Sequence, residues 1–313
     1  MAGAIAGPDP AATLRRRLGL TYRGGASAYL FVLPSIIFIG VFVIVPIFAA
    51  LFYSFNDYDL LTAPEFAGLK NYELIGKEPR FWPSIRNTIF FAFGTVPTGI
   101  ITSLLLAVLI NRAIRGIYFF RAMFYMPVVS SFVSVSLIFL WMYEPQFGLA
   151  NQVLEFLGFA RSKWLRGPET AMVAIIMMSI WKNMGLNMVI YLAGLQSIPP
   201  HLYEAAEIDG AGRLSKMFRI TVPLLAPTTD FVVIVYFIGA LQMFVQVFIM
   251  ACEPQGNCGG PLDATITIVL LIYLEAFNNL RMGFASALSF ILFVVIGLVT
   301  IVNARLLQYE IGY

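Results

Sequence analysis

A short polar island interrupts a chain that is otherwise mostly apolar. It runs Glu204-Ala-Ala-Glu-Ile-Asp-Gly-Ala211, and three basic residues follow it at a spacing of three, Arg213, Lys216 and Arg219. Each carboxylate of the island would cost several kcal/mol in hydrocarbon, so the island must lie in water at one membrane face. Apolar runs long enough to cross a bilayer flank it on both sides. A charged loop in this position suits the docking of a soluble protein.

The chain lacks the residue sets that the common enzymatic and cofactor chemistries need. One histidine and two cysteines among 313 residues argue against a catalytic triad and against a typical zinc or iron–sulfur site. No G-x-x-x-x-G-K-[ST] sequence occurs, so the chain has no phosphate-binding loop and cannot hydrolyse ATP alone. The net charge of +3 is too small to indicate nucleic acid. We therefore predict a protein that is not an enzyme, with no metal or cofactor of its own and no nucleic-acid partner.

Side-chain amides and aromatic rings gather inside two of the apolar runs. The residues are Asn183, Asn187, Tyr236, Gln242, Phe244 and Gln246. The two asparagines are four residues apart, as are the two glutamines, so each pair would form one polar stripe on a helix. Amides that both donate and accept hydrogen bonds, beside aromatic rings, suit a neutral polyhydroxylated ligand. The alternative is that these amides hydrogen-bond between helices and have a structural role.

The elements that would position these groups are membrane-spanning helices. The chain is 59% hydrophobic and only 12% charged, with a mean hydropathy of +0.83, whereas a soluble domain averages about 25% charged residues. Backbone polar groups in lipid must be satisfied internally, so the fold class is an all-α polytopic membrane protein. Six runs are long enough to span a bilayer, near 28–54, 84–111, 118–142, 170–195, 222–252 and 282–307. A shorter apolar run, 264–277, contains Glu275 and is expected to be interfacial or re-entrant.

The distribution of basic residues predicts which ends of the spans face the cytoplasm. The densest cluster, Arg15 to Arg17 with Arg23, precedes the first span, and such a cluster usually stays inside. The run that follows is too long for the core of a signal peptide, so we expect an uncleaved first span. We expect residues 1–26 to form a cytoplasmic tail and 27–313 the six-helix domain, with both termini in the cytoplasm. The island at about 200–220 then faces the cytoplasm as well.

The island and several loop sequences resemble those of the membrane subunits of binding-protein-dependent ABC importers. The island matches the EAA loop of that family, with E-A-A, D-G-A, a basic helix and then Ile220-Thr-Val-Pro-Leu-Leu-Ala-Pro227 in order. Further similar segments are Gly68-Leu-Lys-Asn-Tyr72, Pro145-Gln-Phe-Gly-Leu-Ala-Asn151 and Gly283-Phe-Ala-Ser-Ala-Leu-Ser289. The resemblance covers about residues 28–310. Six spans without a long outer insertion look like the first of the two paired permeases of maltose-permease-like sugar importers.

The resemblance implies a fold, partners and a site for coupling. It implies the type I importer permease fold in a bacterial or archaeal cytoplasmic membrane, half of a path for a di- or oligosaccharide, and no catalytic residues. The implied partners are a second permease in a heterodimer, a dimer of ATPase subunits that binds the ATP and Mg, an extracytoplasmic solute-binding protein and the lipid bilayer. The implied contacts with the ATPase are Glu204, Ala205, Ala206, Asp209, Gly210, Ala211 and Gly212. If 202–212 is a helix, Glu204 and Glu207 share one face of it.

Alternative functions and one departure from the family pattern remain. Glycerol-3-phosphate or glycerophosphodiester permeases share these sequences. A secondary transporter would need carboxylates near the middle of the membrane to bind its coupling ions, and only Asp230 lies near the membrane interior. For Asp230 and for Lys182, a structural role is favoured over contact with substrate. The departure is an extra stretch from Cys252 to Cys258 before Gly259-Gly-Pro261. On the outer side of the membrane these cysteines could form a disulfide, with two free thiols as the alternative.

Overall fold

The chain folds almost entirely into helices. The computed structural model describes residues 25–111, 115–252 and 258–306. These residues divide after Phe52 into two compact units. The first unit contains α2 (Gly25–Ile39), the π-helical turn η1 (Gly40–Ile44) and most of α3 (Val45–Ser54), which continue one another. Together they give one apolar helix, Tyr29–Ser54, whose 26 residues suffice to cross a membrane.

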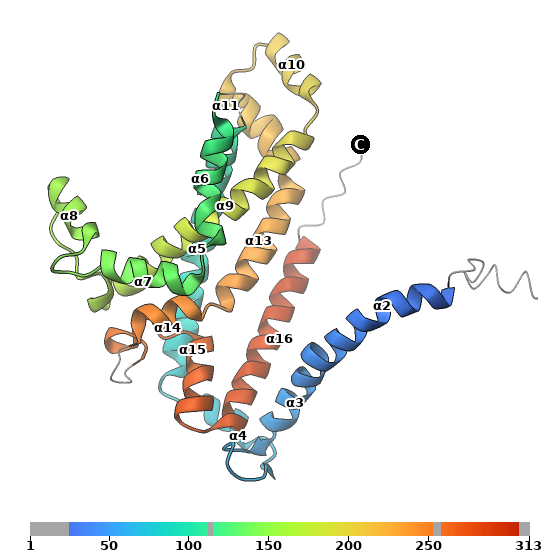
Figure 1. Cartoon of the computed structure of the whole chain (residues 1–313), viewed down its shortest axis with the longest axis vertical. Coiled ribbons are helices and arrows are strands. Elements are labelled where there is room, and N and C mark those ends of the chain that lie inside the picture. The colour runs from blue at the N-terminus through green and yellow to red at the C-terminus, as the bar shows by residue number, and fades with distance from the viewer. Residues whose placement is uncertain (1–24, 112–114, 253–257, 307–313) are drawn as a thin grey trace, which may run out of the picture. The chain divides into compact units, whose positions relative to one another are not determined.

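Three more helices of the described chain are single elements long and apolar enough to span a bilayer. They are α5 (Phe81–Ile110), α9 (Ala171–Ser197) and α16 (Met282–Leu306). Their bounds agree with the second, fourth and sixth predicted spans to within a few residues. α5 and α9 pack against each other over much of their length, and α13 (Ala226–Leu241) contacts both of them and α16 (Figure 1).

The third and fifth predicted spans are not straight helices, which corrects the prediction. α6 (Ile117–Val129) and α7 (Phe132–Met142) meet at a bend of 97°. The segment of α11 (Arg213–Lys216), η3 (Met217–Thr221) and α12 (Val222–Leu224) meets α13 at 65°. Counting each bent pair as one span gives up to six spans by length and composition. The predicted fifth span also extended too far, because α13 ends at Leu241 and α14 (Val245–Ala251) is a separate helix.

Local capping and one distant hydrogen bond explain where these helices break. Ser130 and Ser131 are both extended, and the Ser131 side chain caps α7 by accepting a hydrogen bond of 3.3 Å from the Ser134 backbone N–H. At the break between α13 and α14, the freed carbonyl of Met243 accepts a hydrogen bond of 3.5 Å from the Thr267 hydroxyl. Both breaks therefore leave polar backbone groups that find partners within the protein, as a membrane environment requires.

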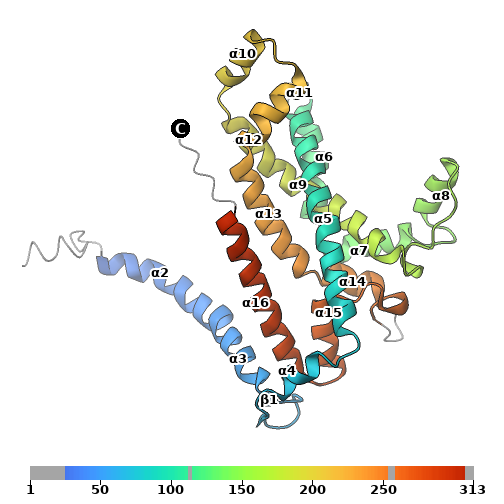
Figure 2. The same cartoon turned by 180° about the vertical axis from the view of Figure 1, so that it is seen from behind.

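The remaining short elements lie at the two ends of the second unit or beside its middle. α10 (Pro200–Ile208) and α11 lie at one end, and α4 (Lys70–Ile75) lies at the other, with the start of α16 (Figures 1 and 2). The others are β1 (Asn56–Asp57) paired antiparallel with β2 (Glu65–Phe66), α8 (Leu149–Phe156), η2 (Trp164–Arg166), η4 (Pro261–Asp263), α15 (Ile268–Tyr273) and η5 (Leu274–Asn278). The apolar run 264–277 thus forms a short buried helix between α14 and α16, too short to be a span.

Candidate functional site

A cavity of about 320 Å³ lies where α9, α13 and α14 meet, next to the start of α7. All six residues predicted for a ligand path line it: Asn183, Asn187, Tyr236, Gln242, Phe244 and Gln246. Phe91, Phe132 and several aliphatic side chains complete the wall. The structure therefore brings the whole predicted set to one place, and we call this space the amide cavity.

One polar group of the amide cavity has no hydrogen-bond partner among the described residues. It is the Asn187 amide nitrogen, which is buried, whereas the buried Tyr236 hydroxyl lies beside the Asn183 side chain. Only 6% of Asn187 is exposed. The Asn183 amide, in contrast, donates to the Ser179 carbonyl one turn back in the same helix, at 2.9 Å. Because an unpaired buried polar group costs about 1–3 kcal/mol, the Asn187 amide is suited to bonding a ligand or water.

The glutamines reach the amide cavity differently from the way we predicted. The spacing of Gln242 and Gln246 predicts one stripe on one helix, and this is wrong. Gln242 is the residue after α13, whereas Gln246 lies in the first turn of α14. The break between the helices turns both amides toward the same cavity.

Lys182 has a structural contact rather than an open path to the cavity. Its side chain is buried, and its ammonium donates to the Val128 carbonyl at 3.0 Å. Val128 lies in the last turn of α6, where carbonyls have no partner within the helix and a cation is favourable. The ammonium also lies 4.8 Å from the centre of the Phe132 ring in α7. Lys182 therefore binds both arms of the bend, a role that the sequence pattern did not specify.

The polar island forms a helix and a tight turn at one end of the second unit. The helix considered over 202–212 is α10, which begins at Pro200 and ends at Ile208, so it includes Glu204 and Glu207 but not residues 209–212. The turn after it is a Schellman motif: Gly210 N–H donates to the Glu207 carbonyl at 3.0 Å, and Ala211 N–H donates to the Ala206 carbonyl at 2.8 Å. Gly210 has a φ of +75°, which glycine adopts without strain. The chain then turns at Gly212 into α11.

The acidic residues of this loop differ in their contacts. Glu207 forms an ion pair with Lys216 at 2.5 Å, which links α10 to α11. The Lys216 ammonium lowers the pKa of the Glu207 carboxyl by hydrogen bonding to it. Glu204, Ala205 and Gly210 are exposed, so this face of the loop is accessible for docking.

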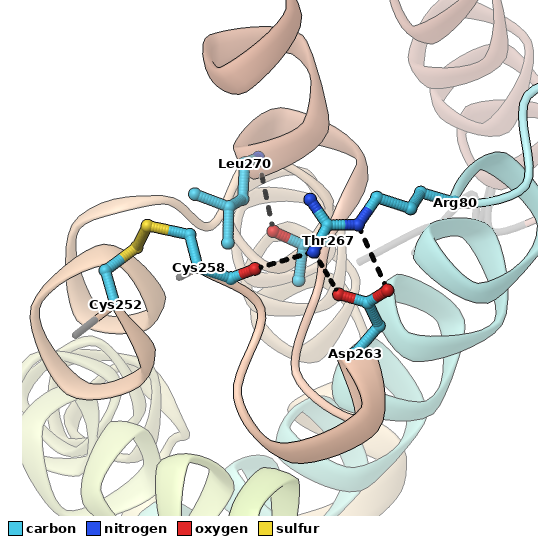
Figure 3. Close-up of a disulfide and its surroundings, with 6 residues drawn as sticks. All are labelled: Arg80, Cys252, Cys258, Asp263, Thr267 and Leu270. Carbon is cyan, nitrogen blue, oxygen red and sulfur yellow. Dashed lines mark hydrogen bonds and ion pairs between the residues drawn. A yellow bond between two sulfur atoms is a disulfide. The ribbon is translucent and has the colours of Figure 1, made fainter. Parts of the chain in front are cut away.

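A disulfide and an ion pair stabilise the loop between α14 and α15. Cys252 and Cys258 are bonded, with an S–S distance of 2.05 Å. Figure 3 shows Arg80 reaching across to this loop, where it contacts the Asp263 carboxylate at 2.5 and 3.0 Å and the Cys258 carbonyl at 3.0 Å. Asn87 of α5 donates to the Asp263 and Ile266 carbonyls at 2.8 and 3.0 Å. The sequence offered no signal for the pairing of Arg80 with Asp263, because these residues are far apart along the chain.

The disulfide leads to a direct chemical test. We expect no cysteine of the unfolded protein to react with iodoacetamide before reduction, and both to react after reduction. These are the only cysteines of the sequence, so mass spectrometry gives an unambiguous count. In the chain-entropy model, closing this short loop stabilises the fold by about 2 kcal/mol. Alkylation of both thiols without a reductant would contradict the bond.

The bundle of apolar helices, the internal polar cavity and the exposed charged loop define a helical membrane protein of the transport class. Residues 96–309 match the family described as binding-protein-dependent transport system inner membrane component. The chain belongs to this family, and the predicted importer permease is confirmed at the level of the family. Among the described residues, no group of three His, Cys, Asp or Glu side chains could hold a metal.

Several relatives in Bacillus subtilis (strain 168) and Yersinia pestis are similar over almost their whole length. The probable ABC transporter permease protein YesP of B. subtilis is 34% identical over 290 residues, 92% of either chain. The arabinooligosaccharides transport system permease protein AraP of B. subtilis is 32% identical and covers 92% of this chain and 90% of its own. The sn-glycerol-3-phosphate transport system permease protein UgpA of Y. pestis is 30% identical, covering 91% and 95%.

Solved structures confirm the fold. A chain from a bacterial ABC transporter that imports the acidic polysaccharide alginate superposes with a TM-score of 0.78, at 23% identity, over 97% of this chain and 100% of its own. A second alginate transporter structure, in complex with an alginate pentasaccharide-bound periplasmic protein, gives the same TM-score at 24% identity, over 95% and 96%. The all-α importer permease fold predicted from the sequence is therefore the fold that is observed.

Proposed function

We propose that this chain is one of two paired permease subunits of an ATP-driven importer for a neutral di- or oligosaccharide. The proposed setting is a bacterial or archaeal cytoplasmic membrane. The second permease completes the path, a dimer of ATPase subunits binds and hydrolyses ATP with Mg, and an extracytoplasmic binding protein delivers the solute. The name of AraP, and that of the similar sulfoquinovosyl glycerol transport system permease protein SmoG of Agrobacterium fabrum, support a solute of the carbohydrate type.

The chemistry of the amide cavity carries the proposal of a neutral solute. None of the described residues that line it is charged, and its polar groups are amides and a phenol. These groups donate and accept hydrogen bonds, as sugar hydroxyls do. The nearest buried cation, Lys182, has its ammonium on the Val128 carbonyl.

A phosphate-bearing solute is the second candidate, because UgpA is a relative of this chain. A phosphate group is usually bound by Arg, Lys or a helix N-terminus, in charge-assisted hydrogen bonds. The first turns of α7 and α14 border the amide cavity, but within the part of the wall that the structure describes there is no Arg or Lys to balance the charge of a phosphate. A neutral sugar is therefore the better match, and the partner permease would have to provide the cations for a phosphate.

The exposed loop at α10 is the proposed contact with the ATPase. Its position supports this role, because α9 leads directly from the asparagines of the amide cavity to α10. A displacement of α10 would therefore reach the cavity through the short extended link at Ile198 and Pro199 and then along α9. We propose Glu204, Ala205, Ala206, Asp209, Gly210, Ala211 and Gly212 as the residues of this contact.

Alanine substitutions in the amide cavity test the proposed function. We expect Asn187→Ala and Gln246→Ala each to lower sugar uptake roughly fivefold, since one hydrogen bond to a neutral ligand contributes about 1 kcal/mol. Gln196→Ala is the control, because this exposed glutamine of α9 lies outside the cavity wall. The assay is uptake of radiolabelled sugars chosen by a ligand screen on the partner binding protein. Competition by sn-glycerol-3-phosphate but by no neutral sugar would favour the second candidate instead.

A further inference from the structure

A second and larger cavity lies at the other end of the two short helices that border the amide cavity. Its volume is about 640 Å³, and Trp141, Glu144, Phe147, Arg166 and Met250 are among its lining residues. We call it the arm cavity, because it lies along α7 and α14, which pack against each other. Nothing in the function proposed above requires it.

The amide cavity and the arm cavity border the same two helices. In α7, Phe132 lines the amide cavity and Trp141 lines the arm cavity. At 1.5 Å per residue, these positions are about 13 Å apart along the helix axis. In α14, Gln246 lines the first cavity and Met250, one turn further on, lines the second. A ligand that contacts both spaces would therefore have to extend over about 13 Å along these helices.

Two exposed aromatic side chains line the arm cavity. Trp141 is 74% exposed and Phe147 is 67% exposed. Exposed apolar side chains at a concave site are typical of ligand binding, and flat rings are suited to the apolar faces of sugars. Tyr143, in contrast, is buried and stacks on Trp164 with ring centroids 4.8 Å apart. The indole N–H of Trp164 donates in turn to Asn151 at 2.8 Å. The wall behind the two exposed rings is thus fixed.

A single ion pair provides the charge of the arm cavity. Arg166 contacts the Glu144 carboxylate at 2.9 Å. A guanidinium has five N–H donors and this contact uses one, while the carboxylate keeps further acceptor positions. The pair has no net charge, so it offers donors and acceptors to hydroxyl groups without selecting an anion.

The rear of the arm cavity is held in place by covalent and ionic links. Cys252, Gly260 and Pro261 line it. A disulfide joins Cys252 to Cys258, and Arg80 contacts the Cys258 carbonyl and the Asp263 carboxylate (Figure 3). These links restrain the described residues of the rear wall before a ligand binds, which lowers the entropy lost on binding.

We infer that the arm cavity is a second carbohydrate subsite, which binds outer units of an oligosaccharide whose inner units occupy the amide cavity. This inference rests on the proposed function. It adds a preference for ligand length: a monosaccharide fills one space, and a trisaccharide contacts both. The subsite recognises sugar faces through Trp141 and Phe147 and hydroxyl groups through Glu144 and Arg166.

The test is binding of sugars of different length to the assembled importer in nanodiscs, without its binding protein. The probes are maltotriose, arabinotriose and xylotriose with their monosaccharides, followed by saturation-transfer NMR. We expect Trp141→Ala to weaken binding of a trisaccharide about tenfold, the effect of losing one aromatic contact, and to leave the monosaccharide unchanged. Trp82→Ala is the matched control, because Trp82 is similarly exposed at 65% and lines neither cavity.

If the Trp141→Ala subunit does not assemble into the importer, a second pair of variants provides the test. Phe147→Ala should give the same length-dependent loss, and Phe156→Ala is its control, since Phe156 is exposed in α8 outside both cavities. The inference is overturned if no trisaccharide binds the unaltered importer, which would be the result if a partner subunit covers the arm cavity. It is also overturned if the variants lose affinity equally for the trisaccharide and for the monosaccharide. Normal sugar uptake would then leave the proposed function standing. If the complete importer takes up no carbohydrate, the proposed function fails and the subsite fails with it.

Discussion

Replacing Gly210 with valine is expected to lower ATP-driven uptake by at least about tenfold, while the subunit still inserts and assembles. Gly210 has a φ of +75°, and a β-branched residue in this region costs about 1–2 kcal/mol. The chain can avoid this cost by abandoning the Schellman turn, which positions the residues after α10. No atom lies within 4 Å of a Cβ added at Gly210, so the effect arises from backbone conformation and from the docked partner.

The control for this prediction is a glycine with the same left-handed backbone conformation at a different place. Gly158 has a φ of +81° and equally open surroundings, and it follows α8. Gly158→Val should therefore lose similar stability but keep its uptake. Gly210→Asn should retain most of the uptake, because asparagine tolerates the left-handed conformation. The measurements are solute uptake and ATPase activity of the reconstituted complex. Normal coupling of ATP hydrolysis to uptake in Gly210→Val would refute the role of this turn in coupling.

Gly185→Ala is expected to destabilise the subunit by about 3 kcal/mol, at the upper end of the range for overpacked cores. A Cβ at Gly185 would lie 2.2 Å from the Phe124 carbonyl oxygen, which belongs to the backbone of α6 and cannot rotate away. The contact would force α6 away from α9. It would also disturb the hydrogen bond from the Lys182 ammonium to the Val128 carbonyl, which requires α6 and α9 to lie close together.

Gly297→Ala provides a matched comparison in another spanning helix. Gly297 lies in α16, and a Cβ there would meet no atom within 4 Å. Alanine favours a helix over glycine by up to about 1 kcal/mol, so this variant should be neutral or slightly more stable. Thermal unfolding of the purified importer, followed by size-exclusion chromatography, measures both variants. Equal melting temperatures for the two would show that the close approach of α6 and α9 is not a constraint.

The sequence predicted the parts of the fold that local pattern determines. Long apolar runs located α5, α9 and α16, and the charges of Glu204 and Glu207 located the exposed loop. The six amide and aromatic residues also lie together around one cavity, because polar groups within apolar helices tend to face a cavity or another helix; their contact with a solute stays a prediction. The pattern Ser131-Phe-Val-Ser134 could have indicated a helix start inside the third span, since serine is a favoured N-cap.

Other features depend on contacts between distant segments and have no local signal. The break after Leu241 contains neither glycine nor proline, and its freed Met243 carbonyl is satisfied by Thr267 of another segment. The ion pair of Arg80 with Asp263 joins α5 to the loop after α14 in the same way. The arm cavity likewise requires the bend of α6 and α7, which brings α7 beside α14.

The contact of Lys182 with Val128 has a consequence for biosynthesis. A lysine near the centre of a helix opposes insertion by the translocon, by roughly 2.5–3.5 kcal/mol on the biological scale. Its acceptor lies 54 residues upstream, so α6 leaves the ribosome before α9 does. When α9 reaches the bilayer, the carbonyl that will bind its ammonium is already there. The order of translation thus lets α9 enter the membrane beside α6, and a chain with α6 deleted should retain α9 less efficiently in the lipid phase.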